Sequence, residues 1–504
     1  MSNPYSKLGY VGIAEETTPG TAIKPDTYIE ILSEDINVEY AVTPATPVSS
    51  RRDVNKSPAK DKIAISGTIT VLVEANNIGE FLNCFAGAPS NTTVLANKVY
   101  EHVWDLANTN EKAYTIDVQP ADANYVIRYV GVKISQLAFS QSDNKIQCAI
   151  AITAQKAFTN ARITTALGNS TALKLDQSSG VTTDDVLRVI DKDSFAVDDT
   201  ASITTVDSET AITLAEVATG SVGDILVLQQ SSPIFTGSDE MIWIGGSEVK
   251  MKADNNKGNP IYNTDDKNVE DFSINLNNEL EARYAATGNN LADRFPSSVK
   301  VKGFTADGNV NILFTNSERL DDMRSNEQVA IRFDFIGKKL DTNSAETASV
   351  AIGSGNAQIL VTASTAGEDG NDLNVRIVAN DTDVLAASID GNNILLELAS
   401  TTTASNTSTL SAIAINALTG VTAAAGGTGA GETQLVAKTN LETGRDANQR
   451  ELLRIDLPHT IFAPFNQNIA EDDLIVEEID WNAYWDNTDS RTCRVLLRNA
   501  ISDY

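Results

Sequence analysis

Two seven-residue stretches, Glu34-Asp-Ile-Asn-Val-Glu-Tyr40 and Glu270-Asp-Phe-Ser-Ile-Asn-Leu276, lie far apart in the chain and share one pattern of polar and apolar residues. In both, polar side chains alternate with apolar ones. A period of two is typical of a β-strand with one face in water and the other in a core. Its repetition predicts that the chain contains two copies of one β-rich unit.

The segments that follow each stretch extend the likeness. Strand-like runs over residues 62–73 and 299–314 each lead into one amphipathic, helix-like segment, at 74–85 and 315–323. Three more strand-like segments complete each copy, and we match them in chain order as 112–118 with 451–457, 125–134 with 472–479, and 145–152 with 491–497. The matches predict two tandem β-domains with one helix each; the alternative is a chance likeness between two unrelated β-domains.

Two segments differ in composition from this duplicated frame. Residues 343–448 contain no Phe, Tyr or Trp and are rich in Ala, Thr, Ser, Gly and Asn, yet they include strand-like runs and one helix-like run at 408–418. This pattern predicts a small α+β module, with a disordered Ala/Thr tract as the alternative. Residues 159–231 are acidic, and their short alternating runs between Asp, Gly and Ser clusters predict a small antiparallel barrel or sandwich.

The predicted fold class is therefore mainly β, and a chain of 504 residues is long enough for several domains. An insertion is tolerated where the two ends of the host loop lie close together. The expected domains are a first β-domain at 1–158, an all-β module at 159–231, a second β-domain formed by 232–342 and 449–504, and an inserted α+β module at 343–448.

Charge and cysteine content exclude several classes of protein. The formal net charge is -30, so the surface as a whole repels nucleic acid, and a protein that grips DNA is disfavoured. We expect neither a cleaved export signal nor a membrane anchor, because no basic flank with an apolar core opens the chain and no apolar run is long enough to span a bilayer. The three cysteines, Cys84, Cys148 and Cys493, predict no disulfide and suit a reducing compartment.

The residue types that carry most catalytic and metal chemistry are scarce. The two histidines, His102 and His459, have no Cys or second His near them in sequence, which favours structural roles. Residues 254–259 start like a calcium loop but place Gly258 where an oxygen ligand is needed, so they predict a turn. The Gly cluster at 426–431 is not followed by the Lys-Ser/Thr of a phosphate loop and also predicts a turn. We therefore expect no enzyme activity, no cofactor and no metal ion.

Several of these segments, in this order, resemble the tail tube (major tail) proteins of long-tailed bacteriophages. The resemblance covers about 330 residues and omits the two modules. It rests on the following segments: Gly9-Tyr-Val-Gly-Ile-Ala-Glu-Glu-Thr-Thr-Pro-Gly-Thr21, Ser66-Gly-Thr-Ile-Thr70 with Ile78-Gly-Glu-Phe-Leu82, Phe272-Ser-Ile-Asn-Leu-Asn-Asn278 with Arg283-Tyr-Ala-Ala-Thr-Gly288, and Asp456-Leu-Pro-His459 with Val495-Leu-Leu-Arg-Asn499.

The resemblance implies a structural protein of the virion tail, assembled in the host cytoplasm, in which each β-domain supplies one sector of a β-barrel ring. Two sectors in one chain would suit trimeric rings with pseudo-sixfold symmetry, stacked into a tube. The implied partners are other copies of the chain, other tail proteins (tape measure, terminator and distal tail proteins), and double-stranded DNA in transit without tight binding. The competing function classes are a multi-domain surface adhesin or glycan-binding protein, and a glycan-processing virion enzyme.

A conduit for DNA favours a wall without basic side chains, because each phosphate held by Lys or Arg would slow passage. The polar faces of the two opening stretches are the candidates for the lumen, although an outer, solvated face would have the same pattern. These candidate residues are Asp35, Asn37, Glu39, Asp271, Ser273 and Asn275.

A proline-containing, basic stretch at 42–61 is the candidate for contacts between rings. Pro disfavours a central strand, so the stretch predicts a long loop that reaches the next ring, with a mobile surface loop as the alternative. The basic side chains would pair with acidic groups there. The candidate residues are Pro44, Pro47, Arg51, Arg52, Lys56 and Lys60.

Overall fold

The structure, a computed structural model, confirms a mainly β chain. It describes residues 9–44, 58–95, 98–106, 112–119, 125–142, 145–165, 170–178, 180–208, 210–229, 235, 247–253, 269–284, 294–313, 328–340, 345–400, 405–441, 449–463, 467–468, 476–487 and 490–504. No helix within these residues is both long enough and apolar enough to cross a membrane.

The larger part of the chain forms two sets of antiparallel strands. The first set is β1 (Tyr10–Glu15), β2 (Thr27–Glu30), β3 (Ser33–Glu34), β4 (Asn37–Pro44), β5 (Pro58–Leu72), β6 (Ser90–Leu95), β7 (Val99–Asp105), β8 (Tyr114–Gln119), β9 (Ile127–Ser142), β10 (Lys145–Thr153) and β11 (Lys156–Phe158). The second set is β18 (Ser247–Ala253), β19 (Val269–Arg283), β20 (Ser298–Leu313), β21 (Val329–Lys339), β29 (Arg450–Phe462), β30 (Gln467–Asn468), β31 (Val476–Ala483) and β32 (Arg494–Asn499).

The two sets repeat one pairing pattern. In the first, β4 pairs with β5, β5 with β10 and β10 with β9, while the start of β9 pairs with β8 and β11 and β8 pairs with β1. In the second, the same places are taken by β19, β20, β31 and β29, with β21, β32 and β18 in the places of β8, β11 and β1. A pattern of this length repeated in chain order supports a duplication.

The repeated pattern corrects the strand matches made from sequence. The segment 112–118 (β8) corresponds to β21, 125–134 (β9) to β29, and 145–152 (β10) to β31. Our sequence matches were therefore one strand too late in the second copy. The physical reason is that β21 and β29 are neighbours in the sheet but are separated in sequence by the aromatic-free module, so chain order alone hid their relationship.

Two glycines align the copies residue by residue. Gly67 in β5 lies opposite Ile152 of β10, where the register against β9 shifts. Gly308 in β20 lies opposite Trp481 of β31, and the register of β31 against β29 and β30 changes by one residue between Trp481 and Glu477. On its other side Gly67 lies against Ile36, and Gly308 pairs with Ile274. Ile36 thus corresponds to Ile274, not to Phe272 as the sequence match had it. The shift is two residues, so each side chain stays on the same face of the sheet.

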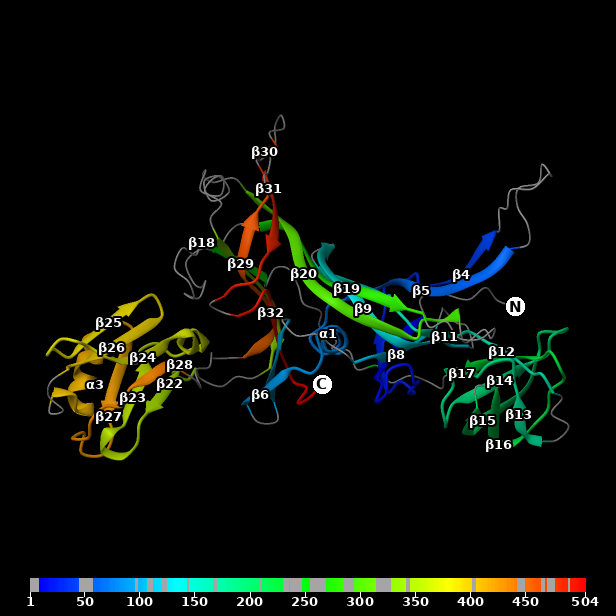
Figure 1. The fold of residues 1–504 in the computed structure, drawn as a ribbon, viewed down its shortest axis with the longest axis horizontal. Coiled ribbons are helices and arrows are strands. Elements are labelled where there is room, and N and C mark those ends of the chain that lie inside the picture. The colour runs from blue at the N-terminus through cyan, green and yellow to red at the C-terminus, as the bar shows by residue number, and fades with distance from the viewer. Residues whose placement is uncertain are drawn as a thin grey trace.

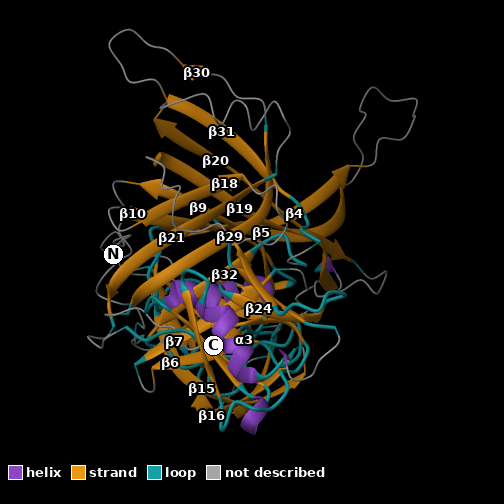
Figure 2. Cartoon of the chain, turned by 90° about the vertical axis from the view of Figure 1, so that its left-hand side faces the viewer, coloured by secondary structure: helices purple, strands orange, loops and turns teal. Residues whose placement is uncertain are grey.

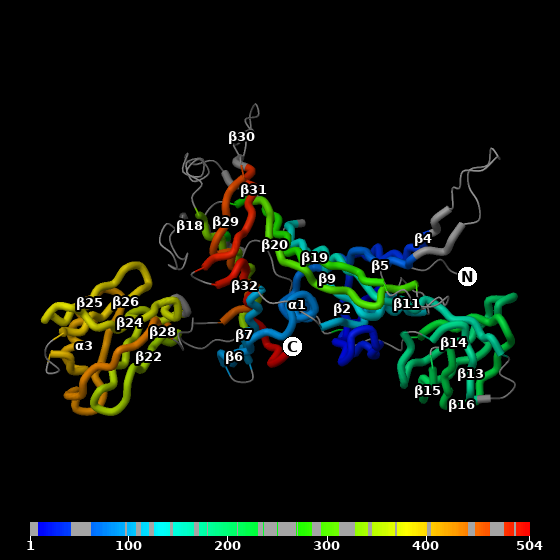
Figure 3. The backbone as a smooth tube through the Cα atoms, viewed as in Figure 1, coloured from blue at the N-terminus to red at the C-terminus, as the bar shows by residue number. Residues whose placement is uncertain are grey.

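The two copies are joined into one structure by two further ladders. The end of β9 pairs with β19, and β32 pairs with β7, so that the C-terminal strand lies beside the first copy (Figure 3). One hydrophobic cluster includes residues of both copies, among them Phe139, Ile274, Trp104 and Leu497. The long strands of both copies consequently lie side by side above the helices (Figure 2).

The helix α1 (Ile78–Ala86) packs beneath this sheet. Ile78, Phe81, Leu82 and Phe85 are buried at helical spacing, which explains why this segment is a helix and not a strand. Gly87 caps its C-terminal end: its φ of 91° is accessible to glycine, and its N–H donates to the Asn83 carbonyl. The second expected helix, at 315–323, lies outside the described residues.

The acidic module forms a closed antiparallel sheet with its own core. Its strands are β12 (Ala161–Arg162), β13 (Ser170–Lys174), β14 (Val186–Ile190), β15 (Val197–Ser208), β16 (Ala211–Ala218) and β17 (Ile225–Gln229). The sheet order is β12-β17-β14-β15-β16-β13, and a bridge between Ile163 and Leu175 joins its two ends. Of the two forms expected from the sequence, a small antiparallel barrel or a sandwich, the closed sheet is a barrel.

The aromatic-free segment is an α+β unit with a separate core, as the sequence predicted. It contains β22 (Ser349–Ile352), β23 (Ile359–Ala363), β24 (Asn374–Ala379), β25 (Ala386–Asp390), β26 (Asn393–Leu398), α3 (Ser408–Asn416), β27 (Val421–Ala425) and β28 (Val436–Asn440), with short 3-10 turns at Gly355–Ala357 and Glu368–Asp372. The Gly cluster at 426–431 forms a turn, in which Gly429 N–H donates to the Gly426 carbonyl. Both small units lie on the α1 side of the long sheet, at opposite ends of the molecule (Figure 1).

Candidate functional site

The six candidate lumen residues lie on one face of one continuous sheet. Asp35 directly follows β3, two residues before β4. Asn37 and Glu39 lie in β4, whereas Asp271, Ser273 and Asn275 lie in β19. The sheet runs β4-β5-β10-β9-β19-β20-β31, and the strand registers place the two groups on the same side. The alternate side chains Ile36, Val38, Phe272, Ile274 and Leu276 face the core.

The strands between the two groups complete a polar surface, which we call the polar sheet face. Its members are partly or fully exposed, and they are Asp35, Asn37, Glu39, Ala64, Ser66, Thr68, Thr70, Gln136, Ala138, Ser140, Gln147, Ala149, Ala151, Thr153, Asp271, Ser273, Asn275, Asn277, Thr305, Asp307, Asn309, Asn311, Glu478, Asp480 and Asn482. None of these positions carries Lys or Arg. Lys62 within β5 and Lys145 at the start of β10 continue the same alternation, and Lys133 of β9 lies opposite Thr153. The face is therefore acidic and small-residue-rich.

Hydrogen bonds hold several of these side chains flat on the sheet. The amides of Asn275 and Asn277 donate to the two carboxylate oxygens of Asp307, at 2.9 and 2.8 Å. The Asp35 carboxylate accepts the backbone N–H of Thr68. These bonds orient acceptors and amides along the surface while leaving its net charge negative.

The candidate inter-ring residues lie only partly within the described chain. The backbone of β4 continues to Pro44, which is opposite Pro58, and Lys60 in β5 is opposite Val42. The hairpin thus extends further into the proline-containing stretch than the sequence predicted. β4 pairs on one side with β5, and a strand at a sheet edge tolerates Pro. Pro47, Arg51, Arg52 and Lys56 lie outside the described residues.

Both histidines lie in β-strands. His102 in β7 is buried; its Nδ1 lies 2.8 Å from Asn91 Oδ1 and its Nε2 lies 2.9 Å from the Ile501 carbonyl oxygen. Burial lowers the pKa of His102. The ring of His459 in β29 contacts the ring of Tyr484. The calcium-like stretch 254–259 lies outside the described residues.

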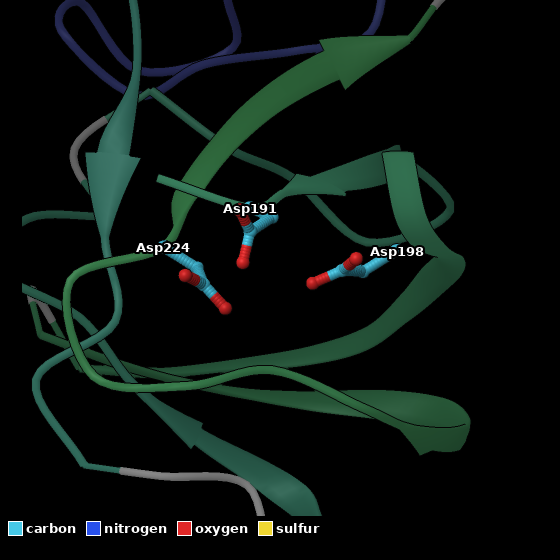
Figure 4. Close-up of side chains that lie close together, drawn as sticks. All are labelled: Asp191, Asp198 and Asp224. Carbon is cyan, nitrogen blue, oxygen red and sulfur yellow. The ribbon is translucent and has the colours of Figure 1, made fainter. Parts of the chain in front are cut away.

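Sequence reasoning missed a cluster of three carboxylates in the acidic barrel. Oxygens of Asp191, Asp198 and Asp224 lie within 4.8 Å of one another (Figure 4). Asp191 accepts backbone N–H groups of residues 193 and 194, and these bonds lower the pKa of its carboxyl. Asp224 accepts the N–H groups of Lys192 and Ser221. These hydrogen bonds to backbone N–H groups show that Asp191 and Asp224 stabilise turns.

Sequence reasoning also missed two buried ion pairs at equivalent places in the two copies. Arg128 of β9 binds Asp117 of β8, and Arg332 of β21 binds Asp456 of β29. Because β8 corresponds to β21 and β9 to β29, the Arg and the Asp have exchanged places between the two copies. Burial alone would raise the pKa of Asp456, but the guanidinium groups of Arg332 and Arg454 hold it below its ordinary value. A run such as β8, buried on both faces, gives no alternation from which such a pair could be read.

Arg128 additionally links the body to the acidic barrel. Its Nη1 and Nη2 lie 2.6 and 3.1 Å from the two carboxylate oxygens of Asp185, which precedes β14. Burial opposes the charge of Arg128, but Asp117 and Asp185 outweigh it and raise the pKa of the guanidinium. A second link is the bridge between Val126 and Leu228. The acidic barrel is therefore held against the body by a buried, charged contact.

Comparison with known proteins agrees with the repeated sheet. A family model described as phage tail tube protein matches residues 6–370, which is more than half of the 504-residue chain. A search of curated proteins found no match. The mainly β architecture, the duplicated sheet and this match together show that the chain belongs to the phage tail tube protein family, the structural proteins of bacteriophage tails.

Proposed function

We propose that three copies of this chain close into a ring and that the rings stack into a tail tube that conducts double-stranded DNA. The observation that carries the proposal is the continuous sheet, in which each copy of the pattern supplies one sector: β4-β5-β10-β9 in the first and β19-β20-β31 with β29 in the second. Three chains would supply six similar sectors. Closure would leave no free sheet edge.

The polar sheet face would line the lumen of this tube. It carries acids, amides, hydroxyls and small side chains and no basic residue at the positions named above, so it offers phosphates no counter-charge. The α1 side is covered by the core and carries both small units (Figure 1), which supports placing that side outward. DNA would then pass along a wall that repels it weakly and does not bind it.

The division into 1–158, 159–231, 232–342 with 449–504, and 343–448 is proposed on the same grounds. The two small units have separate hydrophobic clusters, whereas the two halves share one. The small units would decorate the outside of the tube, and tape measure, terminator and distal tail proteins would contact its ends. Assembly would take place in the host cytoplasm.

Negative-stain electron microscopy of the purified protein tests the proposal directly. We expect rings or tubes, and a ring mass equal to three chains. Rings of six chains would contradict the trimer, and a monodisperse monomer under all assembly conditions would contradict the tube.

The stretch beyond the end of β4 is proposed to contact the next ring. Pro44 and Pro58 are the last paired residues of the described hairpin. Arg51, Arg52 and Lys56 lie between them in sequence, in a protein of net charge -30. Deleting residues 46–57 should leave single rings intact and abolish stacking into tubes. Tubes of normal length from this variant would remove the role assigned to the stretch.

A further inference from the structure

The strand pairing that joins the two copies within one chain shows how a similar pairing between two separate chains would be arranged. At this junction Ser273 and Ile274 of β19 lie opposite Ser140 and Phe139 of β9. The same junction brings the amide of Asn278 to the backbone carbonyl oxygens of Phe85 and Ile134. Its geometry therefore specifies which residues meet when a strand of the β19 type joins a strand of the β9 type.

Both strand types recur at the two ends of the sheet. The glycine alignment equates β19 with β4, so that Asp35 and Ile36 take the places of Ser273 and Ile274. Within the described residues, β4 has a partner on one side only, the β5 side. No described strand pairs with the edge of β4 that corresponds to the β9-binding edge of β19. The Ile36 N–H donates to the Glu34 carboxylate at 3.1 Å, a bond that an incoming strand would have to replace.

The other end of the sheet carries the counterpart of β9. Gln147 of β10 lies opposite Ser140, and at the equivalent place Val476 of β31 lies opposite Asn468 of β30. One residue along, Gln467 takes the place of Phe139. β29 therefore corresponds to the start of β9, and β30 corresponds to its end. One edge of β30 is the counterpart of the β9 edge that pairs with β19.

We propose that β4 of one chain pairs with β30 of a second copy in the register of the internal junction, with Asp35 opposite Asn468 and Ile36 opposite Gln467. This inference rests on the proposed ring and adds its residue-level contact. In this register an Asn is paired with an Asp, the same residue types as Asn275 and Asp307, which lie opposite each other within the chain. No like charges face each other at these two positions.

Tyr40 supplies an independent indication that this edge has an occupant. Its side chain is 52% exposed although it lies in β4, and it is the counterpart of Asn278, whose amide binds the first copy at the internal junction. In the proposed register Tyr40 of one chain would meet the second copy near Phe462, the counterpart of Ile134. An exposed aromatic ring would thereby be covered.

Cysteine pairing tests the register in the full chain. The native cysteines are all buried, so they leave a background free of crosslinks. We expect the Asp35→Cys/Asn468→Cys variant to form covalent trimers under mild oxidation. The matched control, Asn37→Cys/Asn468→Cys, is two residues out of register on the same face, where the diagonal separation of about 7–8 Å is too long for a disulfide.

The outcomes separate this inference from the proposed ring. Crosslinking of the control in place of the test pair would overturn the register. Rings visible by microscopy with neither pair crosslinked would overturn the β4–β30 contact and leave the ring intact. Absence of rings in the unmodified protein would instead contradict the proposed function. As a second measurement, Tyr40→Ser should reduce ring yield at least tenfold without changing the melting temperature of the monomer, and unchanged ring yield would count against the contact.

Discussion

Removal of the Arg128 side chain should destabilise the protein more than any surface charge change. Arg128 is 1% exposed and binds Asp117 through Nε and Nη2 at 2.6 and 2.8 Å and Asp185 at 2.6 and 3.1 Å. Asp117 and Asp185 are themselves 1% and 3% exposed. Arg128→Met keeps most of the side-chain volume but leaves two buried carboxylates without their shared cation.

The expected loss follows from the cost of an unpaired buried charge. Removing one partner of a buried ion pair costs about 3–5 kcal/mol, because the remaining charge stays buried without water or a counter-ion to stabilise it. Two carboxylates depend on Arg128, so we expect the upper part of that range. The surface pair of Arg283 with Glu281, at 3.4 Å and with an Arg side chain 62% exposed, should contribute less than about 1 kcal/mol.

Urea unfolding followed by tryptophan fluorescence measures the difference, since Trp104 and Trp481 lie in the shared core. Arg283→Met is the matched control. Adding Asp117→Asn and Asp185→Asn to Arg128→Met should recover part of the loss, because neutral groups are cheaper to bury than charged ones. A free energy of unfolding for Arg128→Met within about 1 kcal/mol of the control would refute the assigned role.

Three further changes test other parts of the structure. Asp271→Lys on the polar sheet face should leave assembly intact and slow DNA release from virions, whereas Asp271→Asn should not; equal release rates would remove the lumen assignment. Gly308→Ala should cost about 1–3 kcal/mol, because a Cβ there would overlap the Ser273 carbonyl oxygen. Gly303→Ala, where the nearest atom to a Cβ is 3.5 Å away, should be nearly neutral; thermal unfolding measures both. Burial raises the pKa of Glu80 to about 7, so the folded protein binds this proton more tightly than the unfolded chain does. The free energy of unfolding should therefore fall as the pH rises from about 4.5 to 7. Glu80→Gln should reduce this fall, and an unchanged pH profile of stability would contradict the assignment.

The local elements follow from the residue pattern along the chain. The period-two stretches around Asp35 and Asp271 are strands with a wet face, the segment at Ile78 is a helix with a buried stripe, and the two segments of unusual composition are separate small units. These features could be predicted because exposure repeats along the chain with the period of the element, and neighbours in sequence are enough to show it.

The choice of strand partners, in contrast, is visible only in the folded chain. The tertiary structure moved the strand correspondence by one element, shifted the alignment of Ile36 by two residues, and joined the copies through β9 with β19 and β7 with β32. Strand pairing links residues hundreds of positions apart, and strands buried on both faces, such as β8, have no alternation to mark their register. The Arg128 cluster depends on such a pairing and on the docking of a second unit, so no local pattern could have shown it.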